Sequence, residues 1–327
     1  MSKLNLLLQA VALCFFSHAL KIEGHRLHPT VLEVLKGNDS IAYDIIHGLA
    51  KQNMESLKSN LIEAITFGKD SSSWDAPYFA IHQTSTRGRD DKYYGLHATM
   101  DVYGHKLKPG QWSTAAIWVT HTGDGARSSI NSIQVGWHIY PEHYGDSRPH
   151  FYIRWTRDGY EKTGCFNMDC PGFIRADGAR VAPGDAIQPV SNVPHGHMQN
   201  ITIRVLKERT SGDWWVYYGS NSVPTGVGRF PRSSFTYLAD KANHFAFGGA
   251  VISHRADPTP PMGSGSFPNG VQGHAASSTN LRIIDENGNS KPITVDLPVL
   301  VTNNKCHSIT PINHGECLYG GPGGCVR

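Results

Sequence analysis

One predicted strand carries three polar side chains that together could do chemistry. Residues 133–140 alternate between apolar side chains and others. Because successive side chains of a strand point to opposite faces, Gln134, His138 and Tyr140 share one face and Trp137 lies on the other. An amide can hold a developing negative charge, and an imidazole or a phenol can exchange protons. The pattern fits the floor of a binding groove, and it fits a solvated sheet face equally well.

Other sequence patterns offer little further chemistry. The chain lacks the His-Glu-x-x-His, Gly-x-Ser-x-Gly and phosphate-loop motifs. His195 and His197 form a His-x-His pair, and the segment 306–317 combines two Cys with two His. Neither has the compact paired spacing of structural zinc sites, and disulfides compete for the cysteines. We therefore predict no metal and no cofactor.

The main domain is predicted to be all-β, because the hydrophobic period becomes two from Tyr78 onward. Seven runs have the alternation of strands: 112–120, 133–140, 151–156, 201–206, 214–218, 245–252 and 281–284. Turn residues separate them, in a chain with 34 Gly and 19 Pro. Without helices between the strands, this order predicts an antiparallel β-sandwich over residues 78–327.

A different pattern precedes this domain. Within 29–67, apolar residues recur at steps of three to five, which is the spacing of one helix face. Gly68 can end the helix, and Lys69–Trp74 reads as a polar linker. We expect residues 25–77 to form a short helical pro-segment or docking element.

Residues 1–24 have the composition of an export signal. The apolar run 6–16 is followed by Ser17-His18-Ala19, a small-x-small cleavage site, and is too short to span a bilayer. We therefore expect a secreted, extracellular protein that is not held in a membrane. Asn38 and Asn200 begin acceptor sequences for glycosylation. The formal net charge of +3, without a Lys/Arg run, argues against a nucleic-acid partner.

The cysteines of the exported chain are expected to form disulfides in an oxidising compartment. They are Cys165, Cys170, Cys306, Cys317 and Cys325, since Cys14 leaves with the signal. The first two are close enough in sequence to pair within a short loop. The last three leave one thiol over, and we expect Cys306 to bond either Cys325 or Cys317.

The order of several motifs resembles the neprosin domain. Ser132-Ile-Gln-Val-Gly-Trp137 and the following Tyr144-Gly-Asp146 are similar to that domain's I-E/Q-A-G-W and Y-G-D motifs. Further matching stretches lie at 155–160, 163–173, 212–215, 247–249, 262–265 and 319–323. Together they span residues 78–327.

This resemblance implies a secreted, mostly plant family with an antiparallel β-sandwich. Its type members are glutamic endopeptidases that cut near proline under acidic conditions. Two residues facing one another across a groove activate a water molecule. Carried over to this sequence, one position falls on Gln134 and the other on Ala250, where the family has the Glu of Gly-Gly-Glu.

The substitution at Ala250 removes the general base of the implied dyad. Gln134 could still act as an oxyanion donor, a role worth about 10²–10³ in rate. It cannot take a proton from water, a step that contributes roughly 10²–10⁴. A displaced carboxylate is the remaining way to restore the base, and Glu142, just past Pro141, is the candidate.

Two hypotheses follow. The favoured one is a catalytically degenerate protein that binds an extended peptide or a cell-wall polysaccharide in the old groove. We expect that groove to be lined by His138, Tyr140, Trp155 and Tyr217. The alternative is an active or weakly active neprosin-type endopeptidase. The side chain opposite Gln134 distinguishes them, because a carboxylate there would favour the enzyme.

Overall fold

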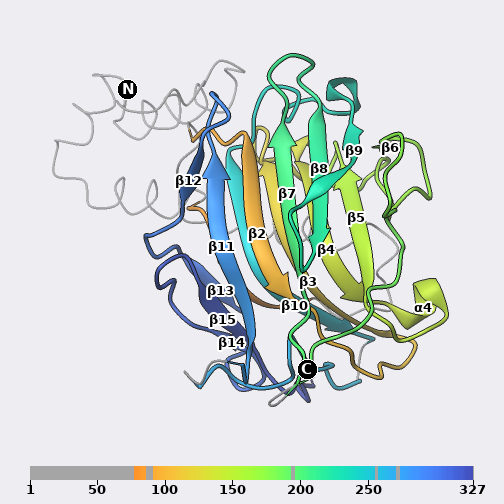
Figure 1. Cartoon of the computed structure of the whole chain (residues 1–327), viewed down its shortest axis with the longest axis vertical. Coiled ribbons are helices and arrows are strands. Elements are labelled where there is room, and N and C mark those ends of the chain that lie inside the picture. Colours follow the sequence, from red (N-terminus) through yellow and green to blue (C-terminus); the bar gives the residue numbers. More distant parts are fainter. Residues whose placement is uncertain (1–76, 86–90, 193–195, 255–256, 270–272, 327) are drawn as a thin grey trace, which may run out of the picture. The chain divides into compact units, whose positions relative to one another are not determined.

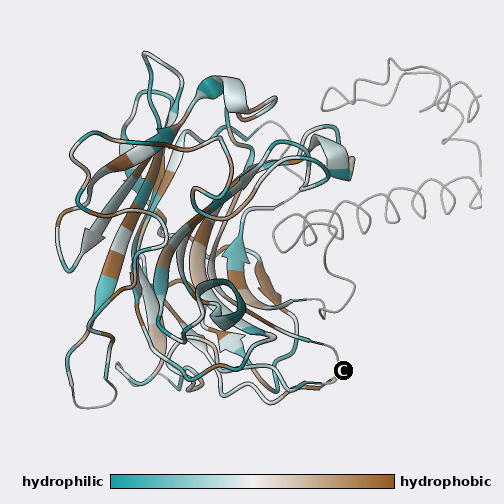
Figure 2. Cartoon of the chain, turned by 90° about the vertical axis from the view of Figure 1, so that its right-hand side faces the viewer, coloured by the Kyte–Doolittle hydropathy of each residue, from teal (hydrophilic) through white to brown (hydrophobic). Residues whose placement is uncertain are grey.

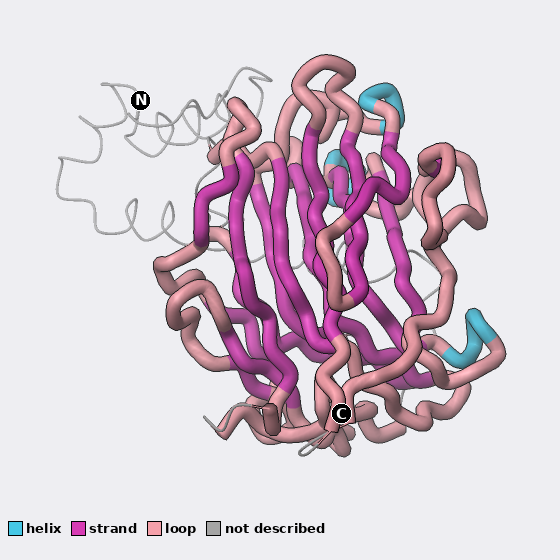
Figure 3. The backbone as a smooth tube through the Cα atoms, in the orientation of Figure 1, coloured by secondary structure: helices cyan, strands magenta, loops and turns pink. Residues whose placement is uncertain are grey.

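The structure is a computed structural model that describes residues 77–85, 91–192, 196–254, 257–269 and 273–326. Strands dominate it, and its helical turns are short (Figure 3). The strands are β1 (Tyr78–Gln83), β2 (Gly95–Asp101), β3 (Gln111–His121), β4 (Asn131–Ile139), β5 (His150–Thr156), β6 (Ile174–Arg175), β7 (Asn200–Lys207), β8 (Trp214–Ser220), β9 (Thr225–Phe230), β10 (His244–Ser253), β11 (Ala276–Ile284), β12 (Ser290–Pro292), β13 (Val299–Val301), β14 (Ser308–Ile309) and β15 (Cys317–Gly320). The helical turns are α4 (Pro141–Tyr144), η1 (Arg127–Ser129) and η2 (Arg232–Ser234).

Two antiparallel sheets pack face to face, one in front of the other in Figure 1. The six-stranded sheet has the order β13-β1-β10-β3-β4-β5. The nine-stranded sheet runs β14-β15-β11-β2-β7-β8-β9-β6, with β12 paired to β11. The predicted antiparallel β-sandwich is confirmed. All seven predicted strands are present. The predicted runs did not include β1, β2, β9 or the short strands β6 and β12 to β15. In β9, Gly226 and Gly228 weaken the strand pattern.

The main core fills the space between the sheets, and polar and apolar segments are interleaved along the strands (Figure 2). From β4 it takes Ile133, Val135, Trp137 and Ile139, the apolar face predicted from the alternation. A second, smaller cluster lies on the opposite face of the six-stranded sheet. It comprises Phe79, Ile81, Trp112, Ala116, Trp118, Tyr152, Ala246, Ala250 and Ile252. The face that carries Gln134 is therefore buried too.

Two disulfides fasten the domain. Cys165 bonds Cys170, and Cys306 bonds Cys325, so the first predicted pair and one of the two alternatives for the second are confirmed. Cys317 is a buried free thiol. The expected export signal 1–24, the helical segment within 25–77 and Asn38 lie outside the described residues. Within the described ranges, no helix is long and apolar enough to cross a membrane.

Candidate functional site

The candidate site lies on the face of the six-stranded sheet that points away from the main core. On β4, Gln134 pairs directly with Trp118 of β3 and with Arg154 of β5. All three side chains are buried. Gly136 follows Gln134 on this face, and an added Cβ there would lie 2.0 Å from the carbonyl oxygen of Ala115. Glycine at 136 therefore lets β3 approach β4 closely beside Gln134.

A chain of hydrogen bonds fixes the Gln134 amide. Its Nε2 donates to the hydroxyl oxygen of Tyr152 at 2.5 Å. That hydroxyl lies 3.1 Å from Oγ1 of Thr114. The single hydroxyl proton of Thr114 is donated to the carbonyl oxygen of Trp137 at 2.7 Å, so the Tyr152 proton is free to be donated to Thr114. Burial raises the pKa of Tyr152, so its phenol stays protonated within this series of hydrogen bonds.

Two complementary polar atoms next to these hydrogen bonds have no partner among the described residues. The Oε1 acceptor of Gln134 and the Nε1 donor of Trp118 are both buried and unpaired, on residues that are direct cross-strand partners. Leaving a buried donor or acceptor unsatisfied costs about 1–3 kcal/mol, so native proteins rarely do so without a reason. A water molecule or a substrate amide that reached both atoms would satisfy them.

Ala250 lies on the same face but in another row. Its cross-strand partners are Phe79 of β1 and Thr114 of β3, and Thr114 in turn pairs with His138 of β4. The row of Gln134 instead reaches Ala246 on β10, through Trp118. Ala250 is thus displaced by four residues, about 14 Å along the strands, and lies in the row of His138 rather than in that of Gln134.

His138 is held so that neither ring nitrogen can act as a base. The Nε1–H of Trp112 donates to Nδ1 at 2.9 Å, and Nε2 lies 2.8 Å from the hydroxyl of Tyr144. The ring stacks on Tyr152 with centroids 3.9 Å apart. Burial, followed by the charges of His143, His150 and Arg154, lowers the pKa of His138 well below its usual value. The imidazole is therefore neutral, with its proton on Nε2.

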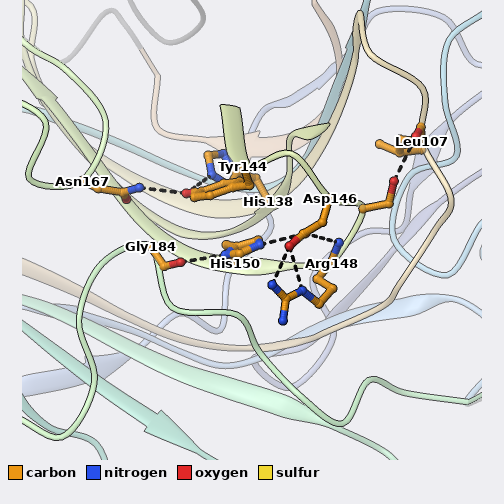
Figure 4. Close-up of polar contacts among 9 residues, drawn as sticks. Leu107, His138, Tyr144, Asp146, Arg148, His150, Asn167 and Gly184 are labelled. Carbon is orange, nitrogen blue, oxygen red and sulfur yellow. Dashed lines mark hydrogen bonds and ion pairs between the residues drawn. The ribbon is translucent and has the colours of Figure 1, made fainter. Parts of the chain in front are cut away.

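Tyr144, the last residue of α4, and Asp146, two residues later, belong to a cluster of polar side chains (Figure 4). Asn167 donates to the Tyr144 hydroxyl at 2.8 Å, and the Tyr144 ring stacks on His150 at 3.8 Å. His150 contacts the carbonyl oxygen of Gly184 at 2.7 Å through Nδ1 and Asp146 at 3.0 Å through Nε2. Gly145, with φ of 76°, provides the left-handed turn at the end of α4. This cluster positions Tyr144 against His138.

Asp146 is the anion of the cluster. The Nε of Arg148 donates to its carboxylate at 2.8 Å, and the Arg148 backbone N–H donates at 2.9 Å. Burial acts against ionisation, but the hydrogen bonds from Arg148 and His150 outweigh it and hold the pKa of Asp146 well below its usual range. The carboxylate is committed to these donors and faces His150 rather than Gln134.

The structure does not bring Glu142 to Gln134. Glu142 lies in α4, past the end of β4, with its side chain 47% exposed and 3.9 Å from Nε2 of His254. Tyr140 is half-buried and stacks on His143. Of the predicted groove residues, His138 and Tyr140 therefore share the face of Gln134.

The expectation that Trp155 and Tyr217 line the same groove is wrong. Trp155 pairs with Ile133 and belongs to the main core, because it follows Arg154 on β5 and its side chain therefore points to the opposite face of the sheet. Tyr217 lies on β8 in the nine-stranded sheet. Asn200 begins β7 and is half-buried, and its backbone N–H bonds the Asn221 side chain.

Along β1, β3, β4, β5 and β10, no carboxylate lies on the face of the sheet that carries Gln134. The residues of these strands that point to this face are all neutral or basic. One further unpaired group is present. His244 of β10, opposite Thr120 of β3, is buried, and neither of its ring nitrogens has a hydrogen-bond partner among the described residues. Burial lowers its pKa to about 4, so the ring is neutral above that pH. Among the described residues, no group of three or more His, Cys, Asp or Glu could hold a metal.

Sequence reasoning missed the residues that surround Gln134. They are Trp112, Thr114 and Trp118 on β3 and Tyr152 on β5, whose side chains point to the same face of the sheet as Gln134. The alternation within 112–120 and 151–156 could have placed them on one face. Which strands pair, and in which register, could not be read from the sequence, so their contacts with Gln134 and His138 could not be predicted.

The matches among solved structures share little sequence with this chain. One is Scytalido-glutamic peptidase with a peptide-based transition state analog, at 15% identity and a TM-score of 0.37, covering 76% of this chain and 98% of the other. Another is a Bacteroides ovatus mixed linkage glucan GH16 structure in complex with a G4G4G3G product. It has 14% identity and a TM-score of 0.29, and covers 50% of this chain and 56% of the other.

The family itself is established by sequence. The family model described as Neprosin matches residues 109–322, which is more than half of the 327-residue chain. The match includes β4 with Gln134, the Tyr144-Gly-Asp146 turn and the Gly248-Gly249-Ala250 stretch of β10. The chain belongs to the Neprosin family.

Proposed function

We propose that this chain is a secreted, peptidase-like protein that binds an extended peptide along the Gln134 face and hydrolyses it very slowly. The observation that supports the proposal is that Gln134 Oε1 and Trp118 Nε1, on cross-strand partners, have no hydrogen-bond partner among the described residues. Both atoms are buried, so a peptide must open this face to reach them. A peptide group offers one donor and one acceptor, and so complements this pair. Secretion is supported by the two disulfides, which form in oxidising compartments.

Slow hydrolysis follows from the lack of a carboxylate on this face along β1, β3, β4, β5 and β10. Ala250 occupies the position where the family has Glu, and both nitrogens of His138 in the same row are engaged. Glu142 is directed to His254. A missing base costs roughly 10²–10⁴ in rate, while the Gln134 amide retains a polar contact for the substrate.

The test compares wild-type chain with Ala250→Glu and Ala250→Gln at acidic pH, on a fluorogenic proline-containing peptide. The two variants have side chains of the same size, and only Glu can take a proton. We expect Ala250→Glu to cleave at least about 10²-fold faster than wild type and Ala250→Gln to remain slow. Adding Gln134→Ala to Ala250→Glu tests whether the two positions act as a pair, and a gain that survives it would show that residues 250 and 134, about 14 Å apart along the strands, act separately.

The alternative is an active endopeptidase that uses another base. His244 is the candidate, since it is neutral, unpaired and on the same face. Rapid wild-type cleavage that His244→Ala abolishes would establish this enzyme and refute the degenerate function. Binding of the uncleaved peptide, measured by fluorescence anisotropy, should weaken in Gln134→Ala under either hypothesis.

A further inference from the structure

The outer face of the nine-stranded sheet carries a row of basic and aromatic side chains across four neighbouring strands. Arg282 on β11 pairs with His97 on β2, His97 with Arg204 on β7, and Arg204 with Tyr217 on β8. Their strand neighbours of opposite parity, such as Val205, belong to the main core. The row therefore points outward, on the side of the molecule that β11, β2, β7 and β8 present in Figure 1.

Two aromatic rings form one end of this row. Trp215 and Tyr217 are alternate residues of β8, with ring centroids 6.3 Å apart. The guanidinium of Arg204 lies 5.8 Å from the Tyr217 centroid, and that of Arg229 lies 5.5 Å from the Trp215 centroid. Gly226 on β9 has no side chain to cover the rings, although a Cβ there would lie 3.6 Å from Trp215 and 3.7 Å from Tyr217.

The positive charge in the row is not balanced locally. Arg229 is paired with Asp213 at 2.9 Å, but Arg282 donates to the hydroxyl and carbonyl oxygens of Ser290, which are uncharged. The Nε of Arg204 is buried and has no hydrogen-bond partner among the described residues. Burial and then the charges of Arg204 and Arg282 lower the pKa of His97 to about 4. Two guanidinium groups thus lack an acidic partner among the described residues.

We propose that this row binds an acidic polysaccharide, a chain of uronic acid sugars. The apolar C–H faces of sugar rings can lie on Trp215 and Tyr217, while guanidinium groups take carboxylates in bidentate geometry. From β11 to β8 the row spans three strand spacings, about 14 Å, which suits a short oligosaccharide. Uronic acids provide both the ring face and the repeating carboxylate that the row complements.

Other polyanions fit the row less well. Nucleic-acid binding draws its affinity from many neutralised phosphates, whereas this row offers two uncompensated cations in a chain of net charge +3. An extended acidic peptide would bind most readily along a free strand edge, but β2, β7 and β8 are interior strands of the sheet. The row also lies on the other sheet from Gln134, so this binding is independent of the peptide site.

The experiment measures binding of the full chain to oligogalacturonate of defined length by isothermal titration calorimetry. Fully methyl-esterified oligogalacturonate, poly-glutamate and single-stranded DNA serve as comparison ligands. The variants are Arg204→Gln, Arg204→Lys and Tyr217→Ala, with Arg180→Gln as the matched control, because Arg180 is exposed in a loop outside the row. Thermal unfolding of each variant verifies that it is folded.

We expect oligogalacturonate to bind and its Kd to rise at least tenfold in Arg204→Gln and Tyr217→Ala. Arg204→Lys should bind with intermediate affinity, and Arg180→Gln should bind like wild type. The methyl ester should bind at least tenfold more weakly than the acid. The proposal is overturned if oligogalacturonate does not bind, if Arg204→Gln and Arg180→Gln weaken it equally, or if poly-glutamate or DNA binds as tightly.

Discussion

The indole N–H of Trp112 donates to Nδ1 of His138 at 2.9 Å, and this bond determines which nitrogen of the buried imidazole carries its proton. Indole can only donate, so Nδ1 must be unprotonated and Nε2 must hold the hydrogen directed to Tyr144. The residue of β4 in the row of Ala250 is therefore a fixed, neutral histidine. Its role here is to position Tyr144 and Tyr152, and it cannot replace the missing carboxylate.

Trp112→Phe should destabilise the chain more than Trp118→Phe. Both indoles are almost fully buried and lose the same atoms, but only the Trp112 N–H bonds His138, while the Trp118 N–H has no partner among the described residues. Loss of the Trp112 bond leaves Nδ1 of His138 unsatisfied, so we expect a difference of about 1–3 kcal/mol in the free energy of unfolding. Urea unfolding measures it. Equal losses in the two variants would mean that the bond contributes nothing.

The fold was largely predictable from the sequence, because apolar and polar residues alternate along each strand and so indicate which side chains face the core. The run 133–140 placed Trp137 in the core and Gln134 on the opposite face, and both positions are confirmed. The pairing of Cys165 with Cys170 followed from their short separation, whereas the choice of Cys325 over Cys317 as partner of Cys306 depends on how the C-terminal segment crosses the sheets.

The site was less predictable, because it depends on register between strands far apart in sequence. The row that joins Ala250, Thr114 and His138 combines three strands, and a shift of two residues would replace it with another row of the same face. Trp155 illustrates the same limit. An aromatic ring would suit a groove, but Trp155 follows Arg154 on β5 and therefore points into the main core.

Asp146→Asn should weaken the chain at neutral pH and have less effect in acid. The hydrogen bonds from Arg148 and His150 hold the pKa of Asp146 well below that of an unfolded aspartate. A lowered pKa means that the stabilisation is complete above about pH 4 and is lost as the pH falls through the folded value. The gap in Tm between wild type and variant should therefore narrow below pH 4. Asp177→Asn, at an exposed loop position, should show no such narrowing.

The ionised Asp101 carboxylate should lower the stability of the chain at neutral pH, whereas the Asp146 carboxylate raises it. Its carboxylate is buried at the end of β2, accepts the N–H of Ser277 at 2.8 Å, and lies near the unpaired hydroxyls of Tyr103 and Tyr319. Burial raises its pKa from 3.8 to about 6, against the hydrogen bond from Ser277. The folded chain thus binds a proton that the unfolded chain has released, and its stability falls as the pH rises from about 4 to about 6.

Asp101→Asn should remove this loss, since asparagine can still accept the Ser277 N–H and never ionises. A rise in pKa from 3.8 to about 6 corresponds to about 3 kcal/mol. The variant should therefore be more stable than wild type by up to this amount at pH 7 and no more stable at pH 3.5, as measured by urea unfolding across the range. A stability gap that does not change with pH would show that Asp101 does not take up a proton on folding. A gap that closes in acid would show that the buried Asp101 carboxyl takes up a proton on folding. The backbone carbonyl of the same residue accepts the indole N–H of Trp137, from the strand that carries Gln134.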